Sequence, residues 1–167
     1  MVTVIIPGYS AHNKAWLEET ANSIHGDGEV RSIYWNHWTD PESPFNPTEK
    51  ANLLDSVTGK RVVDIIAKSI GTLVAAHLIT KSPEKIRKVI LCGIPLNDLG
   101  EEEKETIRVA LGKIPPENVI CFQNDEDPHG GTEAVKRFLS EFSEDIQVVE
   151  KVRDDHEYFY QEEFNKF

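Results

Sequence analysis

A serine stands between two small residues where an apolar run ends, in the segment VVDIIAKSIGTLVAAHL. Ala67 and Gly71 lie two residues before and two residues after Ser69, and their small size permits a tight turn there. A strand pattern precedes the turn and a helix pattern follows it, which is the context that presents a nucleophilic serine hydroxyl. The same turn would place the Ile70 amide at a helix N-terminus, where a developing negative oxygen is stabilised.

Two downstream segments contain the partners that such a serine requires. A serine hydroxyl is a weak nucleophile at neutral pH, so it needs an imidazole base, which in turn needs a carboxylate to orient it. Acidic residues follow one strand pattern in CFQNDEDPHGG, and His156 follows the last strand pattern in RDDHEYF. The chain order of serine, acid and histidine predicts acyl transfer with Ser69 as the nucleophile.

Strand patterns alternate with helix patterns along the whole chain and must position these residues. The strand patterns, rich in Val and Ile, cover residues 2–6, 30–35, 61–67, 86–92, 118–123 and 145–150. Several are apolar without alternation, which is typical of strands buried on both faces of a parallel sheet. Helices are expected over residues 13–24, 48–57, 69–81, 101–111, 131–142 and 155–167. The pattern predicts one α/β domain over residues 1–167, three-layered and doubly wound around a mainly parallel six-stranded sheet.

The segments that follow the strands should share one rim, because ligands bind at the carboxyl ends of the strands in such a sheet. Ser69, the acidic turn and His156 all lie in these segments. His37 and Trp38 also do, and they are expected to be either a pocket wall or packing residues.

On these motifs, the sequence resembles small serine hydrolases of the α/β-hydrolase superfamily that have no cap domain, over nearly the whole chain. The resemblance implies that Asp127, in the turn over residues 124–128, is the triad acid and that His156 is the base. It also implies an oxyanion hole made by the backbone amides of Tyr9 and Ile70. No insertion long enough for a lid follows the strand over residues 86–92, which implies an open pocket.

Three positions depart from the pattern of that family. Ala67 and Asn124 stand where the family has glycines, and Pro7 stands where it often has a histidine. A second interpretation therefore stays open, a catalytically inactive protein of this fold that serves as a binding or interaction module. Asp98 and Asp125 stay open as alternatives to Asp127 for the acid.

The composition restricts the partners. The chain has 18 basic and 29 acidic residues, a formal net charge of −11, which disfavours nucleic acids and anionic membranes. Cys92 and Cys121 lie in strand patterns and are expected to be buried, reduced thiols. No zinc-type spacing occurs, so a zinc site is not expected. The acyl-transfer mechanism requires neither a metal nor an organic cofactor. Without a membrane-length apolar run or a signal-peptide pattern, the expected setting is cytoplasmic.

The expected function is hydrolysis of a small ester, thioester or amide through an acyl-enzyme. The partner is then a small-molecule acyl substrate, whose identity the sequence does not specify. The oligomeric state is also left open.

Overall fold

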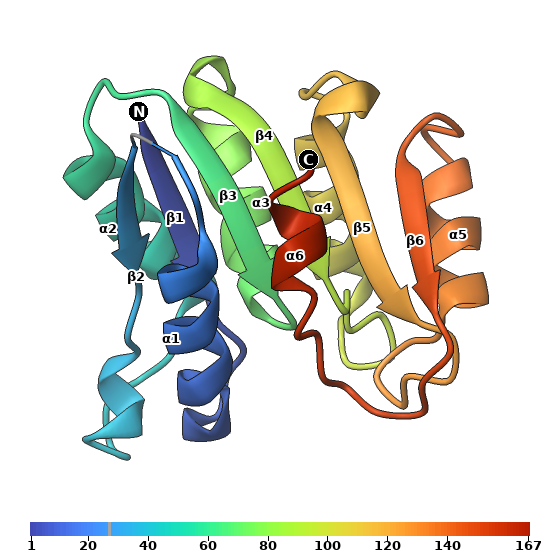
Figure 1. The fold of residues 1–167 in the computed structure, drawn as a ribbon, viewed down its shortest axis with the longest axis horizontal. Helices are drawn as coiled ribbons and strands as arrows, with labels where there is room; N and C mark the ends of the chain where they lie inside the picture. The colour runs from blue at the N-terminus through green and yellow to red at the C-terminus, as the bar shows by residue number, and fades with distance from the viewer. Residues whose placement is uncertain (27) are drawn as a thin grey trace.

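The computed structural model describes residues 1–26 and 28–167, and the strands within them form one sheet. The strands are β1 (Val2–Ile6), β2 (Glu29–Ser32), β3 (Val63–Lys68), β4 (Ile86–Cys92), β5 (Val119–Asn124) and β6 (Gln147–Lys151). Their order is β2-β1-β3-β4-β5-β6, and every neighbouring pair is parallel (Figure 1). The predicted six-stranded, doubly wound sheet is thus confirmed, with an entirely parallel arrangement.

Helices cover both faces of the sheet and form two apolar cores (Figure 1). One face packs against α2 (Pro47–Thr58), α3 (Gly71–Lys81), α4 (Glu101–Leu111) and α5 (Thr132–Ser140). The other face packs against α1 (Lys14–Ser23) and the short α6 (Gln161–Phe164). None of the helices in the described ranges has the length and apolar character that crossing a bilayer would require.

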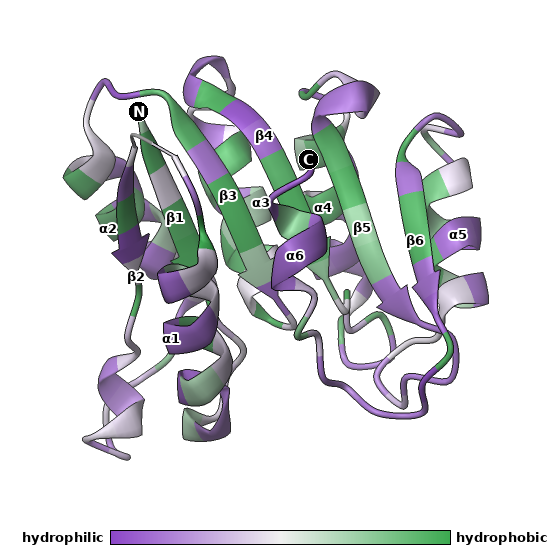
Figure 2. Cartoon of the chain, viewed as in Figure 1, coloured by the Kyte–Doolittle hydropathy of each residue, from purple (hydrophilic) through white to green (hydrophobic). Residues whose placement is uncertain are grey.

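The central strands are apolar because both of their faces are covered. All residues of β1 and β5 are buried, whereas the edge strands β2 and β6 are largely half-buried or exposed. Figure 2 shows hydrophobic colour over most of β1 and β5, with a pale band within β1 and hydrophilic colour at the end of β5. Cys92 and Cys121 lie in this core as free, buried thiols, and burial raises the pKa of Cys121 to about 12. The expectation of two buried, reduced cysteines is confirmed.

The strand register aligns the carboxyl ends of the strands at one edge. Ile6 pairs with Ala67, Lys68 with Cys92, and Asn124 with Lys151, so the segments that follow these strands emerge side by side. The chain reverses its direction of winding between β1 and β3, because β2 lies on one side of β1 and β3 on the other. Such a switch point is where ligands bind in parallel sheets.

The helix expected over residues 155–167 is wrong for its first half, since only Gln161–Phe164 is helical. The preceding residues bond elsewhere. The Tyr158 carbonyl accepts a hydrogen bond from Trp16 Nε1 at 2.8 Å, and the Glu157 N–H donates to the Asp155 side chain at 3.1 Å. These backbone groups are therefore unavailable to a helical ladder.

The strand expected over residues 30–35 is also shorter than predicted. Strand β2 ends at Ser32, although the Ile33 N–H still donates to the Ile5 carbonyl at 3.2 Å. Beyond it, a 3₁₀ turn over Asn36–Trp38 follows Trp35. The sequence pattern extended past the end of the strand because Ile33 and Trp35 are apolar and pack against the core, although Tyr34 between them is exposed.

Candidate active site

Ser69 occupies a strained turn between β3 and α3. Its φ angle is +56°, the left-handed conformation that only this non-glycine residue adopts in the part of the chain that the structure describes. That conformation costs about 1–2 kcal/mol for a residue with a Cβ. The turn is held by hydrogen bonds, because the Ser69 N–H donates to the Cys92 carbonyl at 2.9 Å and the Ser69 carbonyl accepts from the Thr72 N–H at 2.8 Å. The side chain is half-buried at the rim of the sheet.

Gly71 is required by the close approach of the turn to β1. A Cβ added there would lie 2.5 Å from the Ile6 carbonyl oxygen and 2.7 Å from that of Pro7. Both obstacles are backbone atoms, which cannot swing aside as a long side chain can.

We expect Gly71→Ala to destabilise the protein by about 3 kcal/mol, because the added methyl group forces the turn away from β1. Chemical denaturation followed by circular dichroism measures this loss. Gly112→Ala is the matched control, because its Cβ would come no closer than 3.5 Å to a neighbouring atom. An equal effect of the two substitutions would contradict the steric explanation.

His156 and Asp127 meet at the carboxyl edge of the sheet. His156 Nδ1 lies 2.6 Å from Asp127 Oδ2, and the Asp127 side chain is fully buried. The Tyr158 hydroxyl donates to the same carboxylate oxygen at 2.5 Å, and the His129 N–H donates to the other oxygen at 2.8 Å. Burial raises the pKa of Tyr158, so its hydroxyl remains a donor. The carboxylate is thus held in one orientation toward the imidazole.

The pKa of Asp127 is lowered although burial acts to raise it. Hydrogen bonds from His156 and Tyr158 and the charge of His156 outweigh the burial. Because the pKa is lower in the folded protein, the ionised carboxylate stabilises the fold above its ordinary pKa of 3.8. This contribution is lost as the pH falls through the lowered value.

We therefore expect the stability cost of Asp127→Asn to be larger at pH 7 than at pH 3. Urea unfolding of the wild-type protein and the variant at both values measures the difference. A cost that does not change with pH would show that ionised Asp127 contributes nothing to folding.

The other ring nitrogen of His156 is buried without a partner. His156 Nε2 makes no hydrogen bond within the described residues. A Cβ added at Gly93 would lie 2.9 Å from His156 Cε1, and Gly93 directly follows Cys92, to which the Ser69 N–H is bonded. The imidazole and the Ser69 backbone thus contact the same short segment. A buried nitrogen without a hydrogen-bond partner destabilises the folded protein by about 1–3 kcal/mol. A hydroxyl group or a bound substrate that formed a hydrogen bond with Nε2 would remove this cost.

The other two candidate acids bind elsewhere. Asp98 Oδ2 lies 2.5 Å from His129 Nδ1, and both side chains are about half exposed. Asp125 accepts the Arg153 N–H at 2.7 Å, which joins the ends of β5 and β6. Of the three carboxylates left open by the sequence, the structure brings Asp127 to His156 Nδ1.

Two backbone amides lie in the segments that follow β1 and β3, near Ser69 in the fold. Tyr9 follows β1 and Ile70 precedes α3, and neither N–H donates to another group in the ranges that the structure describes. The segments with Tyr9 and Ile70 follow the two neighbouring strands that flank the switch point, β1 and β3. Free N–H groups in such a position can stabilise an oxyanion.

Sequence reasoning missed several residues that hold these segments in place. Asn124 Nδ2 donates to the carbonyls of Asp155 and Glu157 at 2.8 and 3.0 Å. Lys68 is buried, and its Nζ lies 3.0 Å from Glu157 Oε2. The one signal available was a polar side chain inside or directly after an apolar strand, where an unpaired polar group would be costly.

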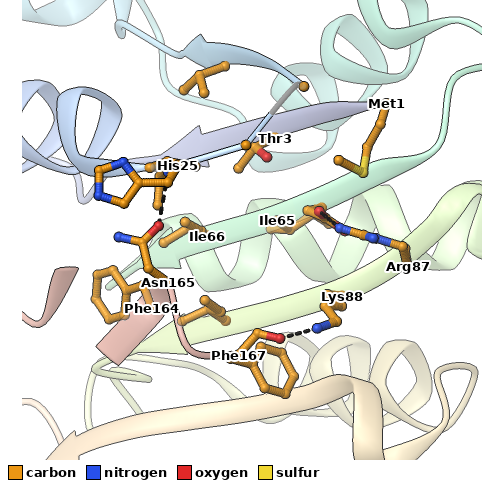
Figure 3. Close-up of a pocket in the computed structure, with 16 residues that line it drawn as sticks. Met1, Thr3, His25, Ile65, Ile66, Arg87, Lys88, Phe164, Asn165 and Phe167 are labelled. Carbon is orange, nitrogen blue, oxygen red and sulfur yellow. Dashed lines mark hydrogen bonds and ion pairs between the residues drawn. The ribbon is translucent and has the colours of Figure 1, made fainter. Parts of the chain in front are cut away.

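A cavity of about 240 Å³ lies away from these residues, against the sheet face on the α6 side (Figure 3). It is lined by residues at the start of β1 and β4, including Thr3 and Arg87, and by the segment after α6. The His25 N–H donates to the Asn165 side chain there, and Lys88 Nζ donates to the Phe167 carbonyl. None of the candidate site residues lines this cavity, so the candidate site is a feature of the opposite edge.

Comparisons with known proteins give matches by structure alone. No protein-family model matches the sequence, and a search of curated proteins finds no match. The monoacylglycerol lipase of Paleococcus ferrophilus matches with a TM-score of 0.65 and 15% identity, over 99% of this chain and 91% of that chain. The protein XC6422 of Xanthomonas campestris, described as an a/b serine hydrolase without lid, matches with a TM-score of 0.62 and 16% identity, over 93% and 72%. The type II thioesterase BorB of the borrelidin cluster matches at 0.61 and 17%, over 98% and 85%.

These matches show the fold of the chain. It has the α/β-hydrolase fold that the motifs predicted. Residues 93–100 alone connect β4 to α4, so no lid domain is inserted at that point.

Proposed function

We propose that this protein is a serine hydrolase that cleaves a small ester, thioester or amide through an acyl-enzyme. The observation that carries the proposal is the state of His156. Its Nδ1 is bonded to buried Asp127, while its Nε2 is buried, unpaired and next to the segment that holds Ser69. The structural neighbours support it, since they include a lipase, a thioesterase and a carboxylesterase of the same fold.

The first step joins the substrate acyl group to the serine. His156 Nε2 takes the proton of the Ser69 hydroxyl as Oγ attacks the carbonyl carbon. The electron pair of the C=O bond moves to oxygen, and the Tyr9 and Ile70 amides stabilise that oxyanion. Asp127 keeps the proton on Nδ1 and stabilises the imidazolium. Collapse of the intermediate expels the alcohol, thiol or amine, which takes the proton from His156.

The second step releases the acid. Water gives a proton to His156 Nε2 and attacks the acyl carbon, and a second tetrahedral intermediate forms in the same hole. Its collapse breaks the bond to Ser69 Oγ, which recovers its proton from His156.

Covalent labelling tests the proposal directly. A fluorophosphonate probe should phosphonylate Ser69, with fluoride as the leaving group, and mass spectrometry of the peptide should locate the adduct. Hydrolysis of short p-nitrophenyl esters should accompany it. A folded protein that neither reacts with the probe nor hydrolyses the esters would favour the alternative, an inactive module of this fold that binds its ligand.

A further inference from the structure

Three aromatic rings from one short segment bond to the loop that carries the Tyr9 amide. The indole N–H of Trp35 donates to the Gly8 carbonyl at 2.9 Å. The Tyr9 carbonyl accepts from the indole N–H of Trp38 at 2.7 Å and from His37 Nε2 at 2.6 Å. A carbonyl oxygen has two lone pairs, so both acceptor positions of Tyr9 are occupied. Two consecutive peptide groups are therefore held by side chains that follow β2.

The geometry of the peptide bond relates the direction of the Gly8 carbonyl to the direction of the Tyr9 N–H. The bond between Gly8 and Tyr9 is trans, as are all peptide bonds in the described residues. In a trans peptide the C=O and the N–H point in opposite directions. The Gly8 oxygen points toward Trp35, so the Tyr9 N–H points away from the Trp35 indole.

Gly8 is buried but Tyr9 is exposed, so the hydrogen bonds to the two carbonyls fix the part of the loop that burial does not hold. Tyr9 is 54% exposed and belongs to neither a helix nor a strand. Its ring stacks on His37, with the centroids 4.3 Å apart, and meets the edge of Phe45 at 5.3 Å. His37 must carry its proton on Nε2 to donate to a carbonyl, while its Nδ1 is buried without a partner. The only hydrogen bond of the His37 ring among the described residues is therefore the one to the Tyr9 carbonyl.

We propose that Trp35, His37 and Trp38 are positioning residues that aim the Tyr9 N–H at the oxyanion. This inference rests on the proposed serine hydrolase. The three side chains do not touch the reacting atoms. They fix the peptide plane of the donor, so that it needs no reorganisation when the negative charge develops.

The test removes one indole N–H at a time and keeps an aromatic, though smaller, side chain at the same position. Trp35→Phe and Trp38→Phe should each lower kcat for a p-nitrophenyl ester by about 10-fold and leave KM within about twofold. A Tyr9 N–H that is no longer well aligned would give only part of the transition-state stabilisation of a full oxyanion donor. Trp35 is buried, so its variant can lose stability, whereas Trp38 is only partly buried and keeps the test interpretable. Tyr34→Phe is the matched control, since its hydroxyl points to Glu18.

Inhibitors separate positioning from packing. A trifluoromethyl ketone forms an oxyanion when Ser69 adds to it, whereas the alcohol obtained by reducing that ketone binds without one. Affinity for the ketone should fall by the same factor as kcat in both variants, and affinity for the alcohol should not change. Folded variants with wild-type kcat and ketone affinity, or with equal losses for ketone and alcohol, would overturn the inference and leave the proposed function intact. A wild-type protein without turnover would overturn both.

Discussion

The Ser69→Ala variant is expected to lose at least about 10,000-fold in kcat for p-nitrophenyl ester hydrolysis. No other hydroxyl is presented by the turn between β3 and α3, so the covalent route disappears with this oxygen. What remains is the stabilisation that the oxyanion donors give to attack by water. Steady-state kinetics measure the loss, and circular dichroism verifies the fold. Ser140→Ala, at an exposed serine of α5, serves as the control and should keep full activity.

A second substitution at Ser69 separates chemistry from strain. Ser69→Gly should be as inactive as the alanine variant, yet more stable than the wild-type protein by about 1 kcal/mol, because glycine adopts positive φ without a Cβ penalty. Thermal or urea unfolding measures this gain. A glycine variant less stable than the wild type would indicate that the +56° turn stores no strain.

Asp127→Asn is expected to lower kcat by about 10,000-fold while the protein stays folded. The amide cannot hold the proton of His156 on Nδ1 or stabilise the imidazolium, so Nε2 is no longer the basic atom. Asp98→Asn is the matched control, because it removes the same charge from a neighbouring carboxylate that bonds to His129 instead.

The pair also distinguishes the acids that the sequence left open. A large loss in the Asp98 variant and a small loss in the Asp127 variant would assign the orienting role to Asp98. That outcome would require His156 to turn away from the carboxylate that it bonds in the structure, and the mechanism would have to be rebuilt around a different rotamer.

The sheet was predictable because strands that are buried on both faces appear in the sequence as short, continuous apolar runs. Strand β4 and helix α4 have the bounds that the apolar and acidic patterns predicted, and β1 does too. The turn around Ser69 was also readable, because steric demand selects small residues at fixed offsets. The turn depends on residues that are close in the sequence, and the strands depend on whether a position is buried or exposed. Both kinds of information can be read from one amino-acid sequence.

The segment after β6 was not predictable on the same grounds. Acidic residues and regularly spaced aromatic residues are typical of a helix, but the backbone of Tyr158 bonds to Trp16, far away in the sequence. The Tyr158 hydroxyl reaches Asp127, and Asn124 bonds to the same segment from β5. Long-range hydrogen bonds of this kind leave no periodic signal. The hydrogen bonds from Trp35 and Trp38 to the loop with Tyr9 could not be predicted from the sequence for the same reason.

The order of elements along the chain has a consequence during biosynthesis. The turn with Ser69 follows β3 and the loop with Tyr9 follows β1, so both emerge from the ribosome early, whereas His156 follows β6. On the proposed function, a nascent polypeptide that has reached β6 would therefore have its nucleophile without its base. It would be chemically inert toward acyl compounds in the cell until the segment with the imidazole has been translated and has docked.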